Sequence, residues 1–189
     1  QNFDGDLTGA LTKAVPLTGT PVELQEGGSA TVHVASNVVD GIKGTLEFKY
    51  GEGDKWLQGT VASATSSGAG INNISGNVTG KIITQQTFAN LDLKTGGSIE
   101  TKMENSRINK LGGTVNYQYG AGTRWMAGTI KLDGATSQPR LLTGTHESNI
   151  IKEYQASTLL KLQPSSGLTG KVEQNDVKTI AGTVAWKDR

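Results

Sequence analysis

The stretch that decides the fold runs from Gly44 to Val61 and reads GTLEFKYGEGDKWLQGTV. Residues 113–130 repeat it as GTVNYQYGAGTRWMAGTI, and residues 182–187 hold a shortened third copy, GTVAWK. The copies start 69 residues apart (113 − 44 = 69 and 182 − 113 = 69). Self-similarity at a fixed period is typical of repeat architectures, in which each copy is one supersecondary unit.

Shorter segments recur at the same interval. The tripeptide VEL at 22–24 returns as LDL at 91–93 and as LKL at 160–162. We therefore predict three tandem repeats over residues 5–61, 76–130 and 142–188, the last one lacking its final strand. We expect them to form a single all-β domain over residues 1–189.

Within a copy, apolar and polar residues alternate. Leu46, Phe48 and Tyr50 fall on one face of an extended chain, and Glu47 and Lys49 fall on the other. Period-two alternation with aromatic and β-branched residues indicates strands that are buried on one side and exposed to solvent on the other. The glycine-rich segments 51–54 and 120–123 are turn sequences, so each full copy is predicted to be a hairpin.

Each repeat is expected to contain about five strands, together forming a single barrel, prism or sandwich-like body. Helix signals are poor, and residues 147–162 are predicted to be strand or loop. The third repeat stops before its second hairpin strand, which leaves an unpaired edge. The N-terminal segment 1–11 could close that edge into a ring, or a neighbouring chain could pair with it.

Composition narrows the classes of partner. The formal net charge is +1, from 18 basic and 17 acidic residues that are interspersed, so no nucleic-acid footprint is expected. With no Cys, neither a disulfide nor a thiolate metal site can form. No apolar run approaches the ~18 residues of a transmembrane helix. The start at Gln1 indicates a processed mature form or a shortened chain. If a signal peptide was removed, the protein is extracellular or at the cell surface, and the richness in Thr, Ser, Asn and Gly agrees with this.

The aromatic residues are the candidate ligand-binding groups. Trp56, Trp125, Tyr50 and Tyr119 recur at matching positions in the first two repeats. Aromatic faces bind the apolar side of a sugar ring, and repeated weak sites add by avidity. The alternative is that these rings fill the core once per repeat, which the alternation favours.

No set of residues predicts catalysis. His33 and His146, the only histidines, occupy non-equivalent positions, and no catalytic or nucleotide-binding motif occurs. Asp4, Asp6 and Asp54 could ligate calcium, but solvated turn carboxylates are the simpler interpretation. We predict a protein that is not an enzyme and has neither cofactor nor metal site.

Residues 42–46 (IKGTL) and 50–53 (YGEG) resemble the L-x-G-T-x-x-Y-x-G-E-G segment of the high-mannose lectins of the Oscillatoria agglutinin type. The resemblance implies tandem repeats closed into one barrel, with mannan as ligand. The family's sugar-binding loops carry Trp next to a Gly-Gly pair. Here 27–28 and 96–97 are Gly-Gly pairs with no Trp nearby, so no binding residue is carried over.

The predicted function is that of an extracellular binding protein with carbohydrate as the leading ligand class. One alternative is a self-assembling surface or fibre protein, a homo-oligomer completed by strand exchange between chains. Another is a pore-forming protein built from amphipathic strands. Loops that differ in length between repeats, around 12–21, 63–75 and 133–158, are the expected places for a binding site.

Overall fold

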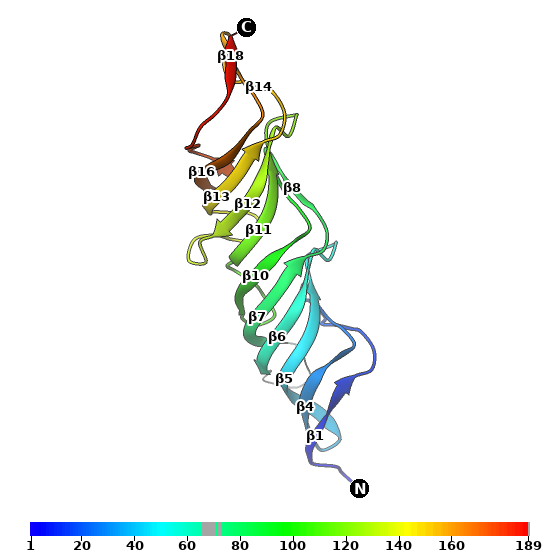
Figure 1. Cartoon of the computed structure of the whole chain (residues 1–189). Helices are drawn as coiled ribbons and strands as arrows, with labels where there is room; N and C mark the ends of the chain where they lie inside the picture. The colour runs from blue at the N-terminus through cyan, green and yellow to red at the C-terminus, as the bar shows by residue number, and fades with distance from the viewer. Residues whose placement is uncertain (66–70, 72, 189) are drawn as a thin grey trace. The chain divides into compact units, whose positions relative to one another are not determined.

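The computed structural model describes residues 1–65, 71 and 73–188 (Figure 1). For residues 63–65 it describes the backbone only. The described residues form strands, turns and loops, and none of them lies in a helix, so they contain no transmembrane helix. This confirms the all-β class. The chain forms two compact units, which are described separately: unit 1 contains Gln1–Thr84 and Ile99–Asn109, and unit 2 contains Gln85–Ser98 and Lys110–Arg189.

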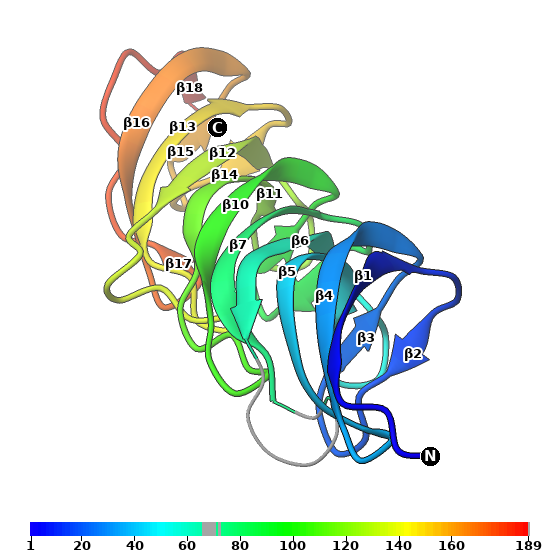
Figure 2. The same cartoon turned by 90° about the horizontal axis from the view of Figure 1, so that it is seen from below.

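Unit 1 is an antiparallel sheet in the order β1-β4-β5-β6-β7, with β2 and β3 off this run of strands (Figure 2). Its strands are β1 (Gly5–Leu11), β2 (Val15–Pro16), β3 (Val22–Leu24), β4 (Gly27–Ala35), β5 (Val38–Tyr50), β6 (Leu57–Thr65) and β7 (Ser75–Ile82). The long strand β5 pairs with β4 along its first part, with β3 along its last residues, and with β6 on its other edge. Strand β10 (Gly96–Met103) is divided between the two units.

Unit 2 is also antiparallel, with the order β11-β12-β13-β16-β17, and a separate sheet has the order β14-β15-β18. Its other strands are β8 (Gln86–Phe88), β9 (Leu91–Leu93), β11 (Gly112–Tyr119), β12 (Met126–Leu132), β13 (Gly144–Ile150), β14 (Tyr154–Gln155), β15 (Leu160–Leu162), β16 (Ser165–Glu173), β17 (Asp176–Val177) and β18 (Trp186–Asp188). The segment 147–162 is therefore strand and loop, as predicted.

The expected barrel is wrong, because the sheets do not close. Among the described strands, β1 pairs only with β4, and β17 pairs only with β16. The reason lies in the connections: each antiparallel strand is added to the far edge of the previous hairpin, so the chain never returns to its first strand. In unit 2, β18 pairs with β15.

Both predicted hairpins are present, and their alternation sets the core. Strands β5 and β6 pair from Tyr50↔Leu57 onward, and β11 and β12 pair from Tyr119↔Met126 onward. Leu46, Phe48 and Tyr50 are buried while the intervening residues are partly or fully exposed. Burial of this apolar face is the main favourable contribution to folding.

Turn chemistry also recurs. The turns after β4, β10 and β16 hold pairs of non-glycine residues at positive φ: Ser36 and Asn37, Asn105 and Ser106, Gln174 and Asn175. Two successive residues at positive φ are the signature of the tight turn whose twist matches that of a β-hairpin.

Strand registers recur at the same interval as the sequence. Val22 pairs with Tyr50 in β3–β5, Leu91 with Tyr119 in β9–β11, and Leu160 with Asp188 in β15–β18. Both partners advance together by 69 residues (91 − 22 = 119 − 50 = 69). The third pairing follows by the same step (160 − 91 = 188 − 119 = 69).

Candidate functional site

The predicted aromatic site residues lie within the packed body of each unit. Trp56, Trp125 and Tyr50 are buried, and Tyr119 is partly buried. The Tyr50 and Trp56 rings meet edge to face with centroids 6.0 Å apart, and the Tyr119 and Trp125 rings do so at 6.1 Å. Such contacts are typical of aromatic packing. The placement favours the alternative in which these rings fill the core.

The two tyrosine hydroxyls are also occupied. In unit 1, the Tyr50 hydroxyl accepts a hydrogen bond from the Ile108 N–H at 3.1 Å. In unit 2, the Tyr119 hydroxyl donates to Asp176 Oδ1 at 2.5 Å. Burial, with a further contribution from the Asp176 carboxylate, raises the pKa of Tyr119 to about 12. Both hydroxyls therefore act as internal anchors.

The two histidines have separate and different surroundings. His33 on β4 lies opposite Asp6 on β1, with Nδ1 2.8 Å from Asp6 Oδ1 and both side chains exposed. The hydrogen bond to Asp6 raises the pKa of His33. His146 is buried in unit 2, where Nε2 donates to the Thr179 carbonyl and Nδ1 lies 2.9 Å from the Ser148 hydroxyl. Neither ring contacts a set of catalytic groups in the described residues.

The acidic candidates for calcium binding, Asp4, Asp6 and Asp54, do not form a set of metal ligands in the described residues. Asp4 accepts a hydrogen bond from the Ser36 N–H at 2.6 Å, and Asp6 binds His33. In residues 1–65, 71 and 73–188, no three His, Cys, Asp or Glu side chains lie together as metal ligands would.

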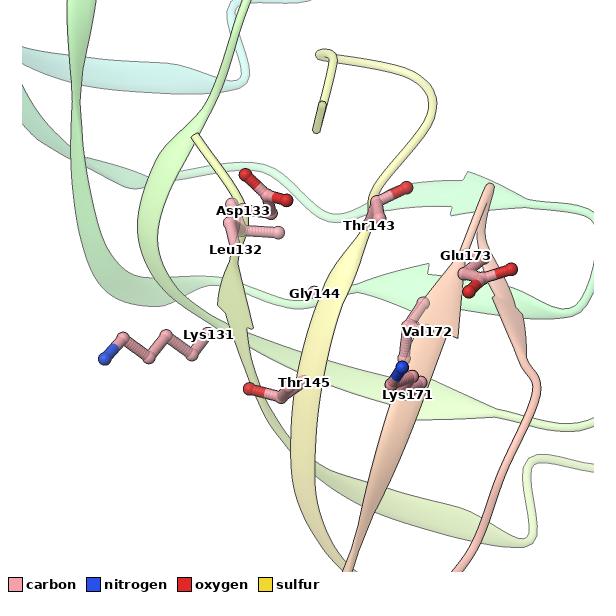
Figure 3. A pocket seen from close by; sticks show the side chains of 9 residues that line it. All are labelled: Lys131, Leu132, Asp133, Thr143, Gly144, Thr145, Lys171, Val172 and Glu173. Carbon is pink, nitrogen blue, oxygen red and sulfur yellow. The ribbon is translucent and has the colours of Figure 1, made fainter. Parts of the chain in front are cut away.

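A groove of about 450 Å³ lies over β12, β13 and β16 in unit 2, and both polar side chains and the apolar Leu132 and Val172 line it (Figure 3). Thr145 lies between Lys131 and Lys171 on neighbouring strands. Asp133 and Glu173 stand on either side of Thr143 at the end of the same strands. Cations, carboxylates and hydroxyls therefore line one open surface, which can donate hydrogen bonds to a polar ligand and accept them from it.

Two features shape this groove. A Cβ atom at Gly144 would lie 2.1 Å from the Lys131 carbonyl oxygen, so only glycine fits at this position in the middle strand. The Ala135 N–H donates to Asp133 Oδ1 at 2.9 Å, and this bond lowers the pKa of Asp133. Asp133 is therefore an anion at neutral pH.

A second, smaller groove of about 260 Å³ lies in unit 1, between the loop that contains Thr20 and the turn after β5. Lys55 and Arg107 contribute its cationic groups, and Glu52 contributes a carboxylate. Both grooves include residues of loops that the sequence singled out, 12–21 and 133–158. Of the third predicted loop, 63–75, residues 66–70 and 72 lie outside the described residues.

No family model matches this sequence, and the chain has no significant match among curated proteins or solved structures. The sequence pointed to one loop of each groove but not to the strand residues that complete it, because these are distant in sequence. It also did not pair His33 with Asp6, which lie opposite each other only through the β1–β4 register.

Proposed function

We propose that this chain is a non-enzymatic, extracellular protein of three tandem repeats whose copies associate by strand pairing. In this proposal, β1 of one copy adds to the free edge of β18 of another. The repeats are supported by the equal spacing of three strand registers and of three turns with paired positive φ. Repeat proteins stack equivalent units, so an open edge is a natural place for the next unit.

The observation that carries the proposal is the exposure of Trp186. This residue pairs with Leu162, as Phe48 pairs with Leu24 and Tyr117 with Leu93. Phe48 and Tyr117 are 0% and 1% exposed, whereas Trp186 is 62% exposed. The same structural position is therefore buried at Phe48 and Tyr117 but exposed to solvent at Trp186.

Strand pairing explains the difference. Phe48 lies opposite Gly59 of β6, and Tyr117 lies opposite Gly128 of β12. Among the described strands, β18 has β15 as its only partner, so nothing lies opposite Trp186 on its other edge. A free edge beside an exposed aromatic ring is a template for strand addition.

β1 has the pattern of the strands that cover the two buried aromatic residues. β6 places Leu57 and Val61 two residues on either side of its glycine, and β12 does the same with Met126 and Ile130. β1 contains Leu7, Gly9 and Leu11 at the same spacing.

The orientation of the side chains on β1 also fits pairing with β18. Gly9 pairs with the buried Ala30, which places Leu7, Gly9 and Leu11 on the apolar face of the β1–β4 pair. Leu7 is nevertheless 52% exposed, and β1 pairs with only one described strand. β1 therefore presents exposed Leu7 and a free edge, and β18 presents the exposed Trp186 ring and a free edge.

These features define an antiparallel register. Gly9 of one copy lies opposite Trp186 of the other, Leu11 lies opposite Val184, and Thr8 lies opposite Lys187. Two different edges meet, so the contact is heterologous and does not close on itself as a two-fold dimer does. Burying one large apolar side chain stabilises by ~3 kcal/mol, while association costs at least ~4 kcal/mol in lost freedom. We therefore expect weak, concentration-dependent, open-ended association.

The absence of Cys allows a direct test. In the double variant Thr8→Cys/Lys187→Cys, the proposed register brings the two thiols together between copies, and oxidation at rising concentration is expected to give a ladder of covalent multimers. The matched control is Thr31→Cys/Lys187→Cys, because Thr31 lies opposite Thr8 on β4, one strand further from the contact. The unmodified chain should show a weight-average mass that rises with concentration in sedimentation.

A chain that stays monomeric at all concentrations, with no more cross-linking than the control, would contradict the proposal. A ladder that forms equally in both double variants would contradict the register.

Carbohydrate binding is the second candidate function, and the groove over β12, β13 and β16 is the observation that favours it. Its lysines can donate to sugar hydroxyls, and Asp133 and Glu173 can accept from them. A glycan array probed with the wild-type chain and with the Lys131→Gln/Lys171→Gln variant tests it. Hits that the variant loses would support this function, and an array without hits at high concentration would exclude it.

A further inference from the structure

The smaller groove, in unit 1, holds a cation whose counterpart in unit 2 has an internal carboxylate partner. Lys55 Nζ donates to the Pro21 carbonyl at 3.1 Å and to the Gly51 carbonyl at 3.0 Å. An ammonium group has three N–H donors, so one donor remains. In the described part of the chain, no carboxylate oxygen lies within 4.0 Å of Lys55 Nζ.

The counterpart of Lys55 is Arg124 (124 − 55 = 69). Arg124 donates from Nε and Nη2 to the two carboxylate oxygens of Asp92, at 2.9 and 2.8 Å, and also donates to the Gly120 carbonyl. Both side chains are largely buried. In unit 2, this cation is therefore neutralised by a two-point ion pair.

Among the described residues of unit 1 no such pair forms, because the equivalent carboxylate has another partner. Glu23 occupies the position of Asp92 (92 − 23 = 69), and its Oε1 accepts from Gln25 Nε2 at 2.7 Å. The carbonyl contacts of the cation are kept in both units, since Gly51 and Gly120 are equivalent acceptors. What differs between the units is the anion.

A second cation faces the same groove. Arg107 Nη1 lies 3.7 Å from Glu52 Oε1, and both side chains are more than half exposed. An exposed ion pair at this distance contributes little free energy and is easily exchanged. The equivalent position in unit 2 is Asp176 (176 − 107 = 69), which carries the opposite charge. Only unit 1 therefore has two cations at this place.

We propose that the groove between Thr20 and the turn 51–54 binds an oxyanion carried by a ligand, a carboxylate or a sulfate group. Lys55 Nζ supplies its remaining donor, and the planar guanidinium of Arg107 supplies a two-point contact, which suits both groups. Glu52 releases Arg107 when the anion enters. This groove shares no residue with the proposed contact between β1 and β18.

The test is a titration of the full chain with sodium sulfate and, in a second arm, with sodium acetate, at constant ionic strength maintained with chloride. The readout is the backbone amide shifts of residues 51–55 and of Thr20. We expect a saturable shift at these residues, and the arm that saturates at lower concentration identifies the preferred oxyanion. Lys55→Gln and Arg107→Gln should each weaken binding at least tenfold, whereas Lys49→Gln and Arg124→Gln should leave it unchanged.

Glu52→Gln should change the affinity for the oxyanion in the opposite direction. Removing the carboxylate that competes for Arg107 should strengthen binding several-fold. Glu100→Gln makes the same change in net charge elsewhere in unit 1 and should have no such effect. Shifts no larger than those caused by chloride, or equal losses in Lys55→Gln and Lys49→Gln, would overturn the proposal.

Discussion

Tyr117 lies directly opposite Gly128 in the β11–β12 pair, and its ring is buried beside a strand position that carries no side chain. Phe48 and Gly59 form the same pair in unit 1. The glycine is required, because a Cβ atom at Gly128 would lie 2.0 Å from the Glu147 carbonyl oxygen of the next strand. Each hairpin thus combines a large ring with a close approach of two backbones.

Substitutions at the three equivalent aromatic positions should have unequal effects on stability. Phe48→Ala and Tyr117→Ala remove buried rings and should each lower the free energy of unfolding by ~3–5 kcal/mol. Trp186→Ala removes an exposed ring and should cost about 1 kcal/mol or less at low protein concentration. Urea unfolding measures the free energy of unfolding of the three variants, and circular dichroism checks that each one is folded. Equal losses would mean that Trp186 is buried in solution.

Replacing glycine by alanine should destabilise the protein only where another backbone lies close to the glycine. Gly128→Ala places a methyl group against Glu147 and Ser148 and should destabilise by ~2 kcal/mol or more. No atom lies within 4 Å of a Cβ built at Gly9, so Gly9→Ala should stay within ~0.5 kcal/mol of the wild type. Thermal unfolding of the two variants provides the comparison. A tolerated Gly128→Ala would contradict the β12–β13 register.

The Asp92–Arg124 pair should stabilise unit 2 in a pH-dependent way. The hydrogen bonds from Arg124 lower the pKa of Asp92, so this contribution is present above the ordinary pKa of an aspartate and is lost as pH falls through the lower, folded-state pKa. Asp92→Asn should cost ~1–3 kcal/mol at pH 7 and should flatten the acid limb of the stability profile. An acid limb that Asp92→Asn leaves as steep as in the wild type would contradict this contribution.

His33 should titrate above its usual range. Its hydrogen bond to Asp6 is the largest cause, and Asp40 and Asp4 add attraction, while Asp6 also has Lys43 4.0 Å away. The folded-state pKa is raised, so the contribution is present below the unfolded pKa of the imidazole and is lost as pH rises through the folded value. The pKa of Asp6 is lowered, so the pair also weakens in acid, when pH falls through that value.

Imidazole proton shifts followed by NMR would give the pKa of His33 directly. Asp6→Asn should bring it down toward 6.5. Asp133→Asn removes the same charge from unit 2 and should leave the pKa of His33 unchanged. A His33 pKa that is unaffected by Asp6→Asn would show that the β1–β4 contact is absent in solution.

Much of the strand pattern was predictable because strand formation is local. Alternation over Leu46, Phe48 and Tyr50 predicts their burial, and the glycine-rich segments 51–54 and 120–123 predict the hairpins that are present. The spacing between copies also places Trp186 in the same series as Phe48, since the copies start at 44 and 182. These inferences need only side-chain periodicity and turn chemistry.

Sheet closure, the burial of the Trp rings and the two grooves depend on contacts between residues that are distant in sequence. Whether the sheet closes depends on which edges meet, and the strands are added outward without returning to β1. The burial of Trp56 and Trp125 depends on the rings packed against them, and Trp125 stacks on Tyr154 with centroids 4.2 Å apart. Both grooves likewise join residues from separate strands and loops.

The sequence by itself determined the all-β class, the hairpins and the 69-residue interval (113 − 44 = 69), because period-two alternation and turn glycines act within a few residues. Only the tertiary structure decided three features of the described residues: the sheet stays open, Trp186 is exposed where Phe48 is buried, and Lys55 has no carboxylate partner where Arg124 has Asp92. These features depend on which strand or side chain lies opposite, and that partner is set by the assembled sheet.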